Sequence, residues 1–197
     1  MRRVSMLGAW LLAATPLAAQ WDVSIEFGEL RFSGASFDTS TTSEPAALRP
    51  SGGGAYRVSI GRWFGSLGVG VGLLYCGTGA VAENEETLVE IKGVSTLYEV
   101  APEALVVLAT PRAGGSLALA IGPLYDHWTF DGYDDRNILG AHAALSLDMP
   151  LDAPWFGTFR IGVAVSPSPW RMEDLPEGYE RRTMWRRSFA AGVRVRL

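Results

Sequence analysis

Few side chains in this sequence have the type and spacing that catalysis or metal binding requires. The two histidines, His127 and His142, each lack a neighbouring histidine, cysteine or carboxylate at the spacing of a metal site. The one cysteine, Cys76, cannot form a disulfide within the chain and is typical of a small residue buried in a core. We therefore expect neither a metal site nor a cofactor.

A nucleophilic set is the catalytic arrangement that the sequence offers. It would use His127 as the base, Ser166 or Ser168 as the nucleophile, and Asp126 or Asp131 as the acid. Such a set works only if the three groups meet in the fold. Neither histidine is followed by a serine two positions later, as the motif of barrel deacylases would require. We therefore expect a protein that is not an enzyme.

Charged side chains of both signs recur at alternate positions within segments that are otherwise apolar or rich in glycine. Alternate residues of a strand share one face, so these charges would lie together on the inner side of a sheet. Opposite charges withdrawn from water can satisfy each other, whereas a lone one is costly. The sequence predicts an interior charged network of Glu26, Arg57, Glu99, Glu103, Asp148, Arg160, Arg186 and Arg194.

The elements that would hold these charges are strands, because apolar and polar residues alternate with a period of two. The clearest segment is 67–79, where five large apolar residues from Leu67 to Tyr75 alternate mainly with glycines. The other expected strands cover 21–32, 55–64, 98–108, 117–130, 139–149, 159–166 and 185–197.

The first strand has an irregular pattern. Trp21 to Phe27 place their large residues at odd positions, whereas Leu30 and Phe32 are at even positions. A bulge after Gly28 would keep all of them on one face. The following residues, 34–52, are rich in serine, threonine, glycine and proline and predict a long loop.

The eight segments and their alternating long and short connections predict an all-β fold, an eight-stranded antiparallel up-and-down transmembrane β-barrel. A soluble barrel places charges outside, whereas a membrane barrel places its apolar face outside. Only 19% of residues are charged, below the roughly 25% of ordinary soluble domains. The chain has 17 basic and 21 acidic residues without a basic stripe, so we expect no nucleic-acid binding.

Residues 1–19 resemble a secretory signal peptide that is cleaved on export. Arg2 and Arg3 precede the apolar stretch from Met6 to Leu12, and small residues follow up to Ala19. We expect a mature barrel over 20–197. No later stretch has the roughly 18 uncharged apolar residues of a membrane helix.

Aromatic residues gather near the ends of the expected strands, which predicts two girdles at the level of the lipid headgroups. The tryptophans of these girdles would be Trp21, Trp63, Trp128, Trp155, Trp170 and Trp185.

The last strand ends with Gly192, Val195 and Leu197, a glycine before two apolar residues at alternate positions. This ending is similar to the C-terminal sorting signal of outer-membrane barrels, many of which end in phenylalanine. With the signal peptide and the eight strands, the chain resembles the small outer-membrane family typified by OmpA, OmpX and OmpW. The resemblance implies outer-membrane lipids and lipopolysaccharide as partners, assisted assembly by the barrel-assembly machinery, and a monomer.

Three functions remain open. The first is a non-enzymatic outer-membrane barrel with a role in membrane integrity or surface interaction, whose lumen is filled by side chains. The second is a transport barrel for small apolar molecules or ions, with a lateral opening of the kind that the OmpW branch implies. The third is a soluble periplasmic binding barrel of the lipocalin kind.

Overall fold

The computed structural model of the 197-residue chain describes residues 20–39, 47–83, 88–111, 114–175 and 177–197. The expected signal peptide, 1–19, lies outside the described residues. The described elements are β1 (Gln20–Asp38), β2 (Ala47–Pro50), β3 (Gly53–Phe64), β4 (Leu67–Glu83), β5 (Leu88–Ala109), β6 (Ser116–Phe130), β7 (Tyr133–Asp152), β8 (Trp155–Ser166), the 3-10 turn η1 (Met172–Asp174) and β9 (Tyr179–Arg196).

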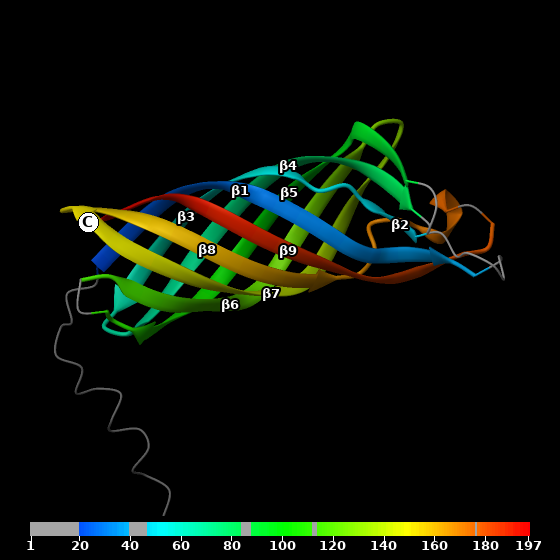
Figure 1. Cartoon of the computed structure of the whole chain (residues 1–197). Coiled ribbons are helices and arrows are strands. Elements are labelled where there is room, and N and C mark those ends of the chain that lie inside the picture. The colour runs from blue at the N-terminus through cyan, green and yellow to red at the C-terminus, as the bar shows by residue number, and fades with distance from the viewer. Residues whose placement is uncertain (1–19, 40–46, 84–87, 112–113, 176) are drawn as a thin grey trace, which may run out of the picture.

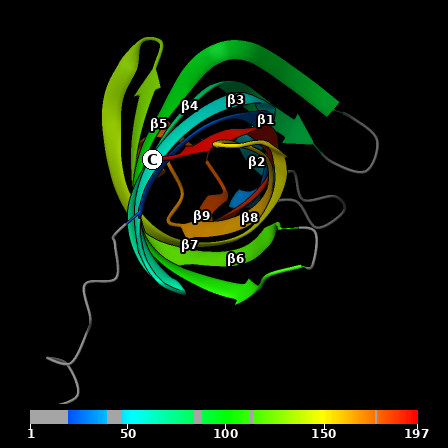
Figure 2. The same cartoon turned by 90° about the vertical axis from the view of Figure 1, so that its left-hand side faces the viewer.

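The strands form one antiparallel sheet that closes on itself, because β1 pairs with β9 as well as with β3. β2 and β3 occupy the same place in the wall, since both lie between β1 and β4. The wall is therefore an eight-stranded up-and-down barrel whose second strand is interrupted at 51–52. Figure 2 looks along its axis and shows the ring of strands. Closure leaves every strand paired on both sides over the body of the barrel.

The two ends of the barrel differ. The start of β1 and the C-terminus share one end with the short connections at 65–66 and 153–154 (Figure 1), which we call the terminal rim. The opposite end, the loop rim, carries β2, η1 and residues 167–175 that follow β8. No helix among the described residues is both long and apolar enough to cross a membrane.

The strands are strongly tilted. A path of registered neighbours that leaves β1 at Trp21 returns to it at Arg31, ten residues further along. A stagger of this size in a barrel of eight strands corresponds to a tilt of about 40°. The path runs through Trp21, Arg62, Val69, Ala104, Ile121, Ala143, Val163, Arg187 and Arg31.

The two faces of the wall have opposite character. Large apolar side chains point outward and are exposed, as Leu73 and Ile161 are at 53% and 62%. Charged side chains point inward, and Glu26 and Asp148 are each only 1% exposed. This polarity is that of a membrane barrel and the reverse of that of a soluble binding barrel.

The bulge expected after Gly28 is not where the register changes. β1 pairs with β3 and β9 without interruption through Gly28, and the irregularity lies between Gly34 and Ser36. Leu30 and Phe32 therefore point into the lumen, where they are 1% and 4% exposed. The large apolar residues of β1 change from odd to even positions because the lumen itself becomes apolar towards the loop rim.

The expected loop at 34–52 was also too long. β1 continues to Asp38, and residues 47–50 form β2. Several other strands extend beyond their expected ends, above all β5, which starts at Leu88, and β7, which starts at Tyr133. These extensions lack the regular alternation of large apolar residues that marks the other strand segments, as at Glu90, Lys92 and Gly93 of β5.

Candidate functional site

The centre of the lumen holds a layer of ion pairs arranged around Arg57. Its guanidinium donates to Glu99 Oε1 at 3.0 Å and to Glu103 Oε1 at 2.6 Å. The neighbouring strand makes room for it, because a Cβ on Gly72 would lie 1.9 Å from Arg57 Nη2. The inward glycine therefore provides the space that this large cation occupies.

Two further arginines extend this layer. Arg186 donates to Glu99 and to Asp126, the latter at 3.3 Å. Arg160 donates to Glu103 and contacts the Ser146 hydroxyl at 3.4 Å. With Arg57, the ion pairs of this layer join three arginines to three carboxylates. Pairing of this kind is what makes buried charges tolerable.

A second layer lies closer to the terminal rim. Arg194 Nη1 is 3.1 Å from Asp148 Oδ2 and 3.6 Å from Asp22 Oδ2. Arg196 also reaches Asp148 at 3.1 Å. The indole N–H of Trp63 donates to Asp22 Oδ2 at 2.5 Å. The ion pairs of this layer join two arginines to two aspartates.

All eight residues expected in the interior network are buried in the lumen. Seven of them form ion pairs, whereas Glu26 accepts a hydrogen bond from Ser24 at 2.9 Å and has no ion pair among the described residues. The expected network left out three residues that form these pairs: Asp22, Asp126 and Arg196. Their inward parity on β1, β6 and β9 was the available signal.

An apolar layer closes the lumen above the charged ones, towards the loop rim. It contains Leu30, Phe32, Leu97, Met184 and the thiol-bearing Cys76, all at most 4% exposed. The rings of Phe32 and Trp128 meet edge to face with centroids 5.6 Å apart. The lumen is thus filled by apolar side chains where the ion pairs end.

Little free space remains between these layers. The lumenal cavities beside Arg57 and Arg160 have volumes of about 10 to 30 Å³. A cavity of that size holds roughly one water molecule. The described lumen is therefore packed rather than open.

Three of the six tryptophans expected in the girdles point outward. Trp21 and Trp155 are exposed at the terminal rim, and Trp185 is exposed near the loop rim. The girdle positions predicted for Trp63 and Trp128 were wrong, because both side chains point into the lumen, where they are 8% and 0% exposed.

Trp63 lies inside because its N–H pairs with Asp22, and Trp128 because it fills the apolar layer. Trp170 belongs to the connection between β8 and β9, where its ring packs on Phe130 with centroids 5.1 Å apart.

A row of outward rings crosses five neighbouring strands on the loop side of the wall. It runs from Phe27 through Tyr56, Tyr75 and Tyr98 to His127, with centroids 5.1 to 6.5 Å apart. Each ring faces the next across the sheet in register. The sequence alone did not predict this continuous row, because its continuity depends on the register between strands.

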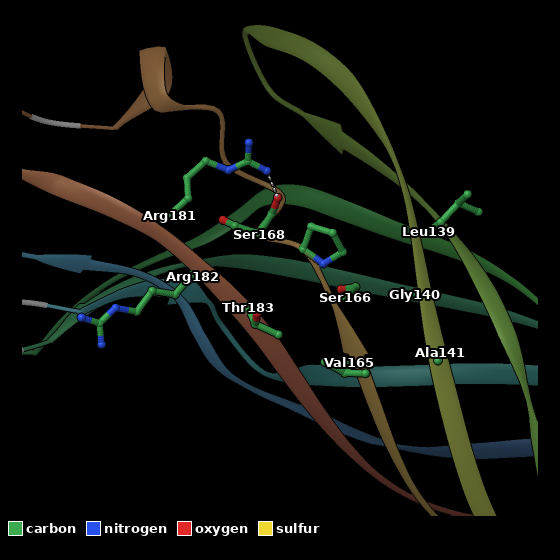
Figure 3. A pocket seen from close by; sticks show the side chains of 10 residues that line it. Leu139, Gly140, Ala141, Val165, Ser166, Ser168, Arg181, Arg182 and Thr183 are labelled. Carbon is green, nitrogen blue, oxygen red and sulfur yellow. Dashed lines mark hydrogen bonds between the residues drawn. The ribbon is translucent and has the colours of Figure 1, made fainter.

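A notch of about 660 Å³ interrupts the wall near the loop rim (Figure 3). It forms because β8 ends at Ser166, while β7 and β9 continue without a strand between them. Ser168 lies behind it, 3% exposed, and its carbonyl accepts from Arg181 at 3.1 Å. The notch is lined by Leu139, Gly140, Ala141, Val165, Arg181 and Thr183, among others.

The possible nucleophilic set is not assembled, because among the described residues no hydrogen bond or ion pair joins His127 to either serine or to either acid of the set. Asp126 points into the lumen towards Arg186, whereas His127, its neighbour in sequence, points outward. His127 Nδ1 lies 2.8 Å from Asn137 Oδ1, and its Nε2 lies 3.6 Å from Asp135. Adjacent strand residues face opposite sides of the wall, so this acid cannot orient this histidine. Within the described ranges, no three histidine, cysteine or acidic side chains cluster as metal ligands do.

Outside the barrel wall, Asp174 fastens the η1 turn to β7. Its Oδ2 accepts from the Arg171 N–H at 2.9 Å and from Arg136 Nη2 at 3.1 Å. Burial favours a higher pKa for Asp174, but the Arg171 N–H and the Arg136 guanidinium outweigh it and lower the pKa. The carboxylate is thus held ionised where the connection folds back over the barrel.

The three C-terminal residues that resemble a sorting signal lie along the last strand. Gly192 faces inward opposite Glu26 and Thr158, and Val195 pairs with Val23. Leu197 is 73% exposed at the terminal rim, and its N–H donates to the Trp21 carbonyl at 2.8 Å.

No protein-family model matches the chain, and no curated protein is significantly similar to it. Solved structures do share its fold. The outer membrane protein OprG from Pseudomonas aeruginosa aligns over 91% of this chain and 96% of its own, with a TM-score of 0.58 and 8% identity. Neisserial surface protein A aligns over 89% and 96%, with a TM-score of 0.55 and 13% identity. At these identities the likeness concerns the fold, a small antiparallel β-barrel of the kind found in outer-membrane proteins.

Proposed function

We propose that this protein is a closed, non-enzymatic barrel of a bacterial outer membrane, exported with a cleaved signal peptide at 1–19. The outward apolar wall supports this placement, because such a surface is stable against acyl chains and not against water. The terminal rim faces the periplasm, and the loop rim faces outward. The barrel works as a monomer in contact with outer-membrane lipids and lipopolysaccharide, after insertion by the barrel-assembly machinery.

One observation carries the proposal that the barrel does not conduct. Two layers of ion pairs and an apolar layer fill the lumen, and the gaps beside Arg57 hold about one water each. Steady passage of a solute would require the opening of all three layers. The protein therefore acts through its outer wall and its loop rim, in membrane integrity or in contacts at the cell surface.

Two measurements test this function. Cell fractionation should recover the protein from outer membranes, with a folded gel band whose mobility changes on boiling. Recovery as a soluble periplasmic protein without that change would instead support a binding barrel of the lipocalin kind. In planar bilayers the folded protein should give no steady single-channel current. A reproducible current would overturn the closed barrel in favour of transport.

The notch between β7 and β9 is the observation that favours the transport alternative. A small apolar molecule could enter it sideways between Leu139 and Val165. Onward passage would have to displace Ser166 and Ser168, which are buried behind the notch. Uptake of a small apolar solute into liposomes that contain the barrel, at a rate above that of empty liposomes, would support this alternative.

A further inference from the structure

Two arginines lie directly opposite each other on the outside of the barrel, at the seam where it closes. Arg31 of β1 and Arg187 of β9 are registered partners, and both side chains are exposed. Residues opposite each other on one face of an antiparallel pair have Cβ atoms about 5 Å apart, and like charges there destabilise the sheet. The position therefore favours an anion that both guanidinium groups can share.

The chain itself supplies little negative charge at this point. Glu29 accepts a hydrogen bond from Arg31 Nε at 2.9 Å, which leaves the terminal nitrogens of Arg31 available. Among the described residues, no carboxylate forms an ion pair with Arg187. Glu29 is thus the one acid in the described part of the chain that forms an ion pair with either of these two cations, and it pairs with Arg31 and not with Arg187.

The surroundings of Arg187 are those of a lipid-facing wall. Along β9 it lies between Trp185 and Phe189, which are 53% and 55% exposed. Across the sheet it pairs with Val163 of β8, which is 49% exposed. An anion bound here would have an apolar surface directly beneath it, on the side of the membrane interior.

Arg62 provides a contrast within the same protein. It also points outward, but at the terminal rim, and its guanidinium lies 5.2 Å from the ring centroids of both Trp21 and Phe64. Aromatic faces stabilise a cation at such distances. Arg62 is therefore satisfied by the chain, whereas the pair on the seam is not.

We propose that Arg31 and Arg187 bind the phosphate of a lipid in the outer leaflet. Guanidinium groups bind phosphate oxygens through paired, charge-assisted hydrogen bonds, and one phosphate can accept from both arginines. The acyl chain of the same lipid lies against Phe189 and Val163. The site thus anchors a phosphorylated lipid at the closing seam, and it rests on the proposed placement of the barrel in the outer membrane.

The test uses the folded barrel in a nonionic detergent, with bound lipid counted by native mass spectrometry. Diphosphoryl lipid A is titrated, and the same glycolipid without its phosphates serves as the comparison. We expect Arg187→Gln and Arg31→Gln each to weaken binding of diphosphoryl lipid A by about tenfold. Arg62→Gln is the matched control and should bind like the unaltered protein, as should all variants towards the dephosphorylated lipid.

Three outcomes would overturn the site. Equal binding of diphosphoryl lipid A by Arg187→Gln and Arg62→Gln would mean that Arg187 does not bind this lipid. Equal binding of the phosphorylated and dephosphorylated lipids would remove the role of phosphate. Displacement of lipid A by millimolar inorganic phosphate would indicate a site for free phosphate instead. The heat-dependent gel mobility, recorded on the same samples, reports separately whether the barrel has folded, so failure of the proposed function would be visible on its own.

Discussion

Arg186 of β9 and Glu99 of β5 form an ion pair across the full width of the lumen, because these two strands are diametrically opposite in the ring of eight. Both residues are buried, at 5% and 4% exposure. Opposite strands share no backbone hydrogen bonds, so side chains alone connect these parts of the wall. The ion pair therefore links two opposite sides of the wall and also helps to fill the lumen.

Removal of one partner should destabilise the barrel strongly. Glu99→Gln leaves Arg186 with Asp126 alone and takes one of two carboxylates from Arg57. Loss of one member of a buried pair costs roughly 3–5 kcal/mol because the remaining charge is uncompensated. Urea unfolding in lipid vesicles, followed by the gel mobility shift, measures this change in the free energy of unfolding.

The control for this experiment is Glu90→Gln, because Glu90 lies outside the lumen and is 3.9 Å from Lys92. Its effect should stay below about 1 kcal/mol. Arg186→Gln should destabilise more than Glu99→Gln, since Asp126 then loses its ion-pair partner. Equal stability of Glu99→Gln and Glu90→Gln would contradict a structural role for the lumenal pairs.

A charge introduced on the outer wall should be costly in proportion to its depth. Val71 lies near the middle of the outward apolar run of β4, and Leu67 begins that run at the terminal rim. Val71→Arg should destabilise the barrel by about 2–4 kcal/mol and Leu67→Arg by about 0–1 kcal/mol. Unfolding in vesicles compares the two. Similar small effects of both substitutions would mean that this face is in contact with water.

The strand pattern was predictable where each strand crosses the apolar band. From Leu67 to Tyr75, large residues point outward and glycines inward, so composition alone distinguishes the two faces. The inward positions of Arg57 and Glu99 followed from the same parity. Alternation is a local property of the chain, and a single sequence contains it in full.

The character of the upper lumen was not predictable in the same way. Leu30 and Phe32 were assigned to the outer face because they are apolar, but they belong to an apolar layer inside the barrel. Trp63 and Trp128 were assigned to girdles because tryptophan favours the headgroup level. Which side a tryptophan takes depends on partners such as Asp22, which lies 41 residues away in sequence.

The inward position of Trp63 leads to its own prediction. Trp63→Phe keeps an aromatic ring but removes the N–H that donates to Asp22, which then retains Arg194 at 3.6 Å. A lost hydrogen bond to a buried charged group costs about 1.5–3 kcal/mol. Trp155→Phe, on the exposed side of the same rim, should change stability by less than about 0.5 kcal/mol. If the two variants unfold at the same urea concentration, Trp63 has no special role inside the barrel.

Asp174 accepts hydrogen bonds from the Arg171 N–H and from Arg136. These two contacts, which we call the Asp174 clamp, should be lost only in acid. The folded-state pKa of Asp174 is lowered, because the Arg171 N–H and the Arg136 guanidinium outweigh the effect of burial. A group with a lowered pKa stabilises the fold above its unfolded pKa, about 3.9 for aspartate, and that stabilisation is lost as the pH falls through the folded pKa. The clamp should therefore be intact from pH 7 to pH 5, and it should be lost only as the pH falls below about 3.9 and through the lowered pKa of Asp174.

The amide proton of Arg171 reports this titration directly, because it is hydrogen-bonded to Asp174 Oδ2 at 2.9 Å. In micelles, the chemical shift of this amide proton should change with pH, with a midpoint below the ordinary pKa of aspartate. Arg136→Gln should move the midpoint upward, since the guanidinium 3.1 Å from Asp174 is removed. Asp174→Asn should abolish the titration altogether. A midpoint above about 3.9 in the unaltered protein would contradict the clamp, because it would mean that burial and not Arg136 controls this carboxyl.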